Sequence, residues 1–112
     1  MAVGETAAEA TLGAEMEARA AEAAALLRLL ANERRLLVLC TLITEGEAPV
    51  GRLADRVGLS QPAMSQHLSR LREEGAVATR RTGTRILYRV ADPRVAPMIA
   101  FFKDLFRPPA LS

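Results

Sequence analysis

The chain has 112 residues, of which half are hydrophobic and a quarter are charged, and its formal net charge is +2. This length allows one compact domain, the hydrophobic content excludes disorder throughout, and no apolar run approaches the roughly 20 residues needed to cross a membrane. The lone Cys40 excludes a disulfide within one chain and a structural zinc site built on cysteines. Residues 1–11 contain two glutamates and no lysine or arginine, which argues against a signal peptide, so we expect a cytoplasmic protein.

The N-terminal part of the chain is rich in alanine and glutamate, which favour helix. We expect residues 1–13 to be frayed or disordered, residues 14–107 to form the folded domain, and residues 108–112 to be a tail. The first helix of this domain is predicted over residues 14–31. Small and apolar side chains recur on one face of that helix at Ala20, Ala24, Leu27 and Leu30.

Three shorter helices are predicted next, over residues 33–44, 50–57 and 61–74. Gly58 ends the second of them in a left-handed conformation, and Ser60 is a favourable N-cap for the third. Helical spacing directs one set of side chains in each helix toward the core. These sets are Leu36, Leu39, Cys40 and Ile43, then Val50, Leu53, Ala54 and Val57, then Met64, Leu68 and Leu71.

The hydrophobic period then changes from that of a helix to that of a strand. Residues 77–81 and 85–90 alternate around Thr82-Gly83-Thr84, which predicts a β-hairpin. A last helix, over residues 93–106, carries seven large apolar side chains, more than one stripe facing its own domain can use. We therefore expect a homodimer through the first and last helices, with contacts at Ala20, Ala24, Leu27, Val95, Met98, Phe101, Phe102 and Leu105.

Residues 50–90 join two short helices to a basic hairpin, which is the order of a helix-turn-helix with a wing. Six arginines and two glutamates lie within residues 70–89, and no acidic residue occurs between Ser60 and Arg72. Glutamine can pair with adenine, serine with a base or a phosphate, and arginine with phosphate or guanine. The same composition also suits an ordinary solvated surface. The candidate contacts to double-stranded DNA are Ser60, Gln61, Ser65, Gln66, His67, Ser69, Arg70, Arg72, Arg80, Arg81 and Arg85.

The string from Leu59 to Val77, LSQPAMSQHLSRLREEGAV, resembles the recognition segment of the ArsR/SmtB-type repressors. The string from Leu30 to Leu36 resembles the opening of the preceding helix in that family, and the resemblance covers about residues 20–106. It implies a mainly α, winged helix-turn-helix fold of five helices and a β-hairpin wing, with a dimer through the first and last helices. It also implies a repressor that binds inverted-repeat operators and releases them when an inducer binds.

Many members of that family sense metal ions, for which this chain offers few ligands. No cysteine lies between Ala48 and Arg52, and the last helix offers only Asp92 and Asp104, so we expect no metal site and no cofactor. The lone His67 is expected to pack or to hydrogen-bond near the DNA. A metal-responsive regulator with an unrecognised site is the alternative, and a module that binds another protein is a third class. One histidine and one cysteine indicate no nucleophile–base pair, so we expect no enzyme.

Spacing alone makes Cys40 a small hydrophobic residue in a buried stripe. The string Leu39-Cys40-Thr41-Leu42 instead resembles the sulfide- and persulfide-responsive branch of the family, in which this cysteine works with a second one near the end of the last helix. Phe106 and Arg107 occupy that second place here. The resemblance therefore implies either a one-thiol sensor or a repressor that no inducer releases. We expect Cys40 to face the last helix, near Phe102, Leu105 or Phe106.

Overall fold

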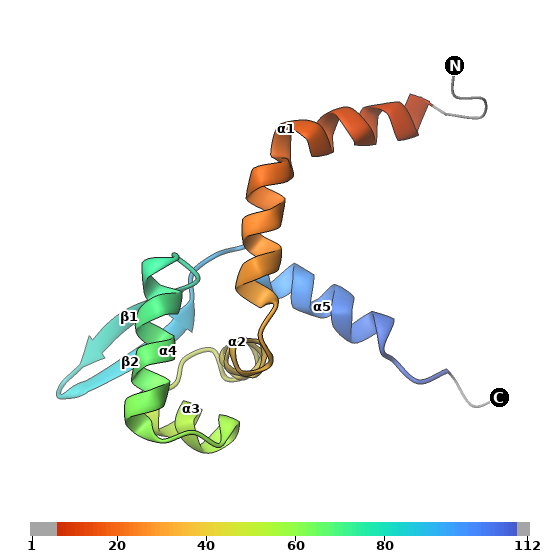
Figure 1. Cartoon of the computed structure of the whole chain (residues 1–112). Helices are drawn as coiled ribbons and strands as arrows, with labels where there is room; N and C mark the ends of the chain where they lie inside the picture. The colour runs from red at the N-terminus through yellow and green to blue at the C-terminus, as the bar shows by residue number, and fades with distance from the viewer. Residues whose placement is uncertain (1–6, 110–112) are drawn as a thin grey trace. The chain divides into compact units, whose positions relative to one another are not determined.

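The computed structural model describes residues 7–109, which form five helices and one two-stranded sheet (Figure 1). The chain divides into two units, one within residues 1–32 and one within residues 33–112. The first contains α1, and the second contains α2, α3, α4, the hairpin of β1 and β2, and α5. This order is that of a winged helix-turn-helix, as the sequence predicts. No helix within residues 7–109 is both long and apolar enough to span a membrane.

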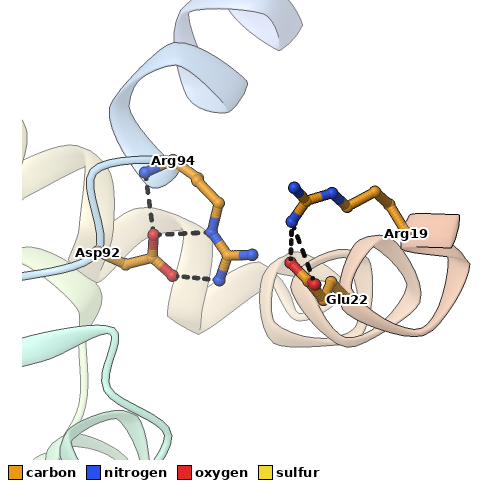
Figure 2. Close-up of polar contacts among 4 residues, drawn as sticks. All are labelled: Arg19, Glu22, Asp92 and Arg94. Atoms are coloured by element: carbon orange, nitrogen blue, oxygen red, sulfur yellow. Dashed lines mark hydrogen bonds and ion pairs between the residues drawn. The ribbon is translucent and has the colours of Figure 1, made fainter. Parts of the chain in front are cut away.

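α1 spans Ala7–Leu30 and therefore begins before the predicted start at residue 14. Alanine and glutamate favour helix strongly enough to continue it through Gly13. Residues 7–13, predicted to be frayed, are thus helical, and residues 1–6 lie outside the described part of the chain. Arg19 and Glu22, three residues apart on this helix, form a surface ion pair at 3.3 Å (Figure 2).

α2 spans Glu33–Glu45 and buries a different stripe from the predicted one. Cys40 is half-buried, Ile43 is 39% exposed, and Leu39 alone of the predicted four is buried. Six of the eight positions from Leu36 to Ile43 are apolar aliphatic residues, so hydrophobic spacing allows more than one stripe and packing selects among them. The side chains that α2 buries are Val38, Leu39, Thr41 and Leu42.

α3 (Val50–Val57) and α4 (Gln61–Glu73) are joined by the turn that the sequence predicts. Gly58 has a φ of 77°, the left-handed conformation, and its N–H donates to the Ala54 carbonyl oxygen at 2.8 Å. The Ser60 hydroxyl accepts a hydrogen bond from the backbone N–H of Ala63 at 3.3 Å and so caps α4. The predicted buried stripe of α4 is confirmed, with no exposed area at Met64, Leu68 and Leu71.

The wing is an antiparallel hairpin of β1 (Val77–Thr82) and β2 (Arg85–Val90), and β1 contacts α4 (Figure 1). Thr82 pairs with Arg85, so the turn has two residues, one fewer than predicted. Gly83 takes a φ of 62° in this turn, a conformation that glycine adopts without steric cost. A separate bridge between Ala48 and Tyr88 joins the hairpin to the loop between α2 and α3.

α5 spans Val95–Leu105 and begins two residues after the predicted start. Just before it, the Asp92 carboxylate accepts hydrogen bonds from the Arg94 side chain, at 3.0 and 2.7 Å, and from its backbone N–H at 2.9 Å (Figure 2). These bonds, chiefly those from the side chain, lower the pKa of Asp92. Val95 is 0% exposed within its own chain, because the first turn of α5 packs into the core. The prediction of Val95 as a dimer contact is therefore wrong.

Candidate nucleic-acid interface

The outward face of α4 presents the polar side chains that the sequence assigns to DNA. A hollow of about 530 Å³ on this helix is lined by hydroxyl, amide, guanidinium and carboxylate groups of Ser65, Gln66, Ser69, Arg70 and Glu73. Hydroxyl, amide and guanidinium groups are those that read base edges and bind phosphate. His67 is half-buried, whereas the other predicted α4 contacts are exposed: Gln61, Ser65, Gln66, Ser69, Arg70 and Arg72.

Gln61, the first residue of α4, has a different environment from Gln66. A Cβ placed on Gly51 of α3 would lie only 3.3 Å from the Nε2 atom of Gln61. The Gln61 amide therefore lies against α3, and the glycine leaves the room that it occupies. In this position Gln61 contributes to the contact between the two helices of the motif, and its role as a DNA contact stays a prediction.

The predicted wing arginines are not equivalent. The Arg80 guanidinium forms a bidentate pair with the Glu47 carboxylate, at 2.9 and 2.8 Å. Within residues 7–109, Arg81 and Arg85 have no carboxylate partner. Because side chains alternate along a strand and paired residues share a face, Arg81 lies on the opposite face of the hairpin from Arg80 and Arg85. Two of the three predicted wing contacts, Arg81 and Arg85, are thus free to meet a phosphate, from two faces.

Three ion pairs connect α2 and the loop after it to the DNA-reading motif. They are Arg35–Glu74 at 3.7 Å, Glu45–Arg52 at 2.9 Å and Glu47–Arg80 at 2.8 Å. The first pair links α2 to the residue after α4, the second links α2 to α3, and the third links the loop after α2 to the wing. No periodic pattern in the sequence predicts these pairs, and partners such as Glu47 and Arg80 are 33 residues apart.

Cys40 lies in a hollow between α2 and α3. This hollow, of about 270 Å³, is lined by Leu37, Cys40, Thr41, Thr44 and Glu45 of α2 and by Arg52 and Arg56 of α3. The sequence predicts that Cys40 lies near Phe102, Leu105 or Phe106 of the last helix. None of these residues lines the hollow, and its other side is formed by α3. Partial burial raises the pKa of the Cys40 thiol, which disfavours the reactive thiolate.

The described residues offer no ligand cluster for a metal ion. No group of three or more His, Cys, Asp or Glu side chains within residues 7–109 is close enough together to hold one. Cys40 and His67 lie on different helices, α2 and α4.

The sequence profile described as "Bacterial regulatory protein, arsR family" matches residues 32–79, which run from the residue before α2 into β1. The transcriptional activator HlyU of Vibrio cholerae is 44% identical to this chain, over 82% of the chain and 84% of its own length. The chain belongs to the ArsR family of bacterial regulatory proteins. It is thus a transcriptional regulator of the ArsR type, as the resemblance of its recognition segment implies.

Two solved structures show the same fold as this ArsR-family regulator. The transcriptional repressor BigR from Xylella fastidiosa is 41% identical, with a TM-score of 0.78, over 85% of this chain and 96% of its own. A homodimeric winged helix-turn-helix DNA-binding domain, Mb0332 from Mycobacterium bovis, is 32% identical, with a TM-score of 0.67, over 93% of this chain and 89% of its own. The winged helix-turn-helix fold predicted from the sequence is confirmed.

Proposed function

We propose that this ArsR-family regulator is a repressor that binds double-stranded operator DNA as a homodimer. The observation that carries the proposal is the outward face of α4, which from Gln61 to Arg72 offers amide, hydroxyl and guanidinium groups and no carboxylate. A recognition helix of this kind enters the major groove, and its N-terminal residues meet base edges. The repressor BigR and the DNA-binding domain Mb0332 support the same assignment by their likeness.

The homodimer is supported by apolar side chains that the protomer leaves in solvent. Phe101 and Leu105, one turn apart on α5, are 58% and 59% exposed. Exposed apolar groups that adjoin one another are characteristic of an interaction surface. In a two-fold dimer the two α4 helices would occupy successive major grooves, about 34–36 Å apart, on an inverted repeat. We expect the partner to be a second copy of this chain.

Gln66→Ala and Arg85→Ala are expected to weaken operator binding in different ways. Gln66 is placed to read a base, so its loss should cost about 1–3 kcal/mol on the preferred sequence and little on other sequences. Arg85 is placed to bind a phosphate, so its loss should weaken binding to all sequences and lower the slope of log affinity against log salt by about 0.9. Affinities are measured on a duplex selected by the wild type and on an unrelated duplex.

Arg19→Ala is the matched control for Arg85→Ala, since both remove one positive charge and Arg19 lies on α1. We expect this control to leave the salt slope unchanged. If Gln66→Ala and Arg85→Ala both change sequence preference alone, the division of the interface into base-reading and phosphate-binding residues is incorrect.

We further propose that Cys40 makes this repressor responsive to persulfides or oxidants. A sulfur or oxygen atom added to the Cys40 thiol would lie in the hollow between α2 and α3. There it would crowd the Arg52 side chain and weaken the ion pair between Arg52 and Glu45. Displacement of α3 would move α4, to which α3 is joined by a tight turn. The second candidate is a repressor without an inducer, which is favoured by the raised pKa of the Cys40 thiol.

Persulfide treatment is expected to weaken operator binding of the wild type about tenfold and to leave Cys40→Ser unchanged. Since only the thiolate reacts and burial raises the pKa of Cys40, modification should be slow at neutral pH and faster by about tenfold per pH unit above it. Operator affinity is measured before and after treatment. Equal affinity in the treated wild type would contradict the response to persulfides. A response that persists in Cys40→Ser would refute the thiol sensor.

A further inference from the structure

The wing needs contacts outside itself, because a two-stranded hairpin is marginally stable on its own in water. Backbone pairing supplies one such contact. Ala48 and Tyr88 exchange two hydrogen bonds, of 3.0 and 2.9 Å, between the α2–α3 loop and β2. β1 also contacts α4, and β2 contacts α2 and α3. A side-chain contact on the tip side of the bridge would add a restraint on the tilt of the hairpin.

Arg80 provides such a contact. Tyr88 pairs with Thr79 in the sheet, so Arg80 is the next residue of β1 toward the tip of the wing. Its Nε donates to Glu47 Oε2 at 2.9 Å, and its Nη2 donates to Glu47 Oε1 at 2.8 Å. Its Nη1 donates to Thr82 Oγ1 at 3.2 Å. All three nitrogens of the guanidinium therefore already have a partner within the protein.

The charge of Glu47 opposes a phosphate at Arg80. Hydrogen bonds from Arg80 lower the pKa of the Glu47 carboxyl, so the carboxylate is ionised at neutral pH. A DNA phosphate at this guanidinium would have to displace the carboxylate and approach its negative charge. Arg81 and Arg85, nearer the tip, have no such partner among residues 7–109.

We infer that Arg80 is a positioning residue of the wing and not a phosphate contact, an inference that rests on the DNA-binding function proposed above. The Glu47–Arg80 pair fixes the tilt of the hairpin against the α2–α3 loop. That tilt determines where Arg81 and Arg85 meet the DNA backbone. Both side chains of the pair are partly exposed, so the pair contributes little to the free energy of unfolding of the domain. Its main effect is on the orientation of the wing.

The test compares operator binding of full-length variants at several salt concentrations. Arg80→Ala and Glu47→Ala should each weaken binding about threefold, and the double variant should bind no more weakly, because each substitution removes the same pair. The salt slope should stay at its wild-type value in Arg80→Ala, whereas Arg85→Ala lowers it by about 0.9. Tighter binding by Glu47→Ala, or a slope lowered in Arg80→Ala as in Arg85→Ala, would overturn the inference.

Two further variants separate the geometry of the pair from its charge. Glu22→Ala breaks a surface ion pair of α1 and removes the same charge as Glu47→Ala, so it should not weaken operator binding. The exchanged pair, Glu47→Arg with Arg80→Glu, restores an ion pair at the same place and should recover most of the lost affinity. An exchanged variant that binds as weakly as the single variants, or weaker binding by Glu22→Ala, contradicts the positioning role.

A measurement without DNA distinguishes failure of this inference from failure of the proposed function. Amide hydrogen exchange at Ala48 and Tyr88 reports opening of the bridge beneath the wing. Exchange should be faster in Glu47→Ala and Arg80→Ala and unchanged in Arg85→Ala. Unchanged exchange in the first two overturns the positioning role whether or not DNA binds. If the two variants exchange faster but the wild type binds no duplex DNA, the positioning of the wing is supported and only the proposed function is overturned.

Discussion

Phe101→Glu is expected to separate the proposed homodimer and to weaken operator binding at least about 100-fold. Phe101 is a large aromatic residue that is 58% exposed in the protomer, and Leu105 beside it is 59% exposed. Burial of a phenylalanine in an interface contributes about 2–3 kcal/mol, and a glutamate at that place would lose its hydration without gaining a partner. In a two-fold interface each residue occurs twice, so the dimer loses the free energy contributed by Phe101 in both protomers.

Light scattering at micromolar concentration measures this effect, with circular dichroism to show that the fold is retained. Ala96→Glu is the control, because Ala96 is exposed on the same helix and lies about 140° around it from Phe101. We expect the control variant to remain dimeric. If the Phe101→Glu variant stays dimeric and binds the operator as the wild type does, this face of α5 is not the interface.

Leu68→Ala is expected to lower the free energy of unfolding by about 2–5 kcal/mol, the largest stability effect predicted for this chain. Leu68 is fully buried at the centre of the stripe through which α4 packs, between Met64 and Leu71. Truncation would leave a cavity beneath the recognition helix. The loss of packing would therefore also loosen the orientation of the outward face that carries Ser65 and Gln66.

Urea unfolding at one fixed protein concentration measures the change, since the stability of a dimer depends on concentration. Ser69→Ala is the neighbouring control, and because Ser69 is exposed we expect a change within about 0.5 kcal/mol. A Leu68→Ala variant as stable as the Ser69→Ala control would contradict the assigned orientation of α4.

Local signals predicted the helix-turn-helix and the wing well. Gly58 in the left-handed conformation, the Ser60 cap and the stripe of Met64, Leu68 and Leu71 are all as the sequence predicts. Each of these features depends on residues within one or two turns of one another. The hairpin was predicted for the same reason, with its turn one residue too long.

Features that depend on packing between distant segments were not predicted. The apolar run of α2 is compatible with several stripes, so the sequence did not reveal that Cys40 lies toward α3. The sequence predicts Val95 as a dimer contact because the last helix is apolar on more than one side, and only the packed structure separates its inner from its outer residues. The Glu47–Arg80 pair joins a loop to a strand, whereas the composition of the hairpin predicts Arg80 as a DNA contact.

Selection of binding sites from random duplex DNA tests the central claim, that a symmetric pair of α4 helices reads an operator. The wild type should enrich an inverted repeat whose half-sites are centred about one helical turn apart, or a multiple of it. Gln66→Ala, selected in parallel, should lose base preference at the same position in both half-sites and keep it elsewhere. Enrichment of an unpaired or directly repeated site, or an unchanged motif in Gln66→Ala, would contradict the account.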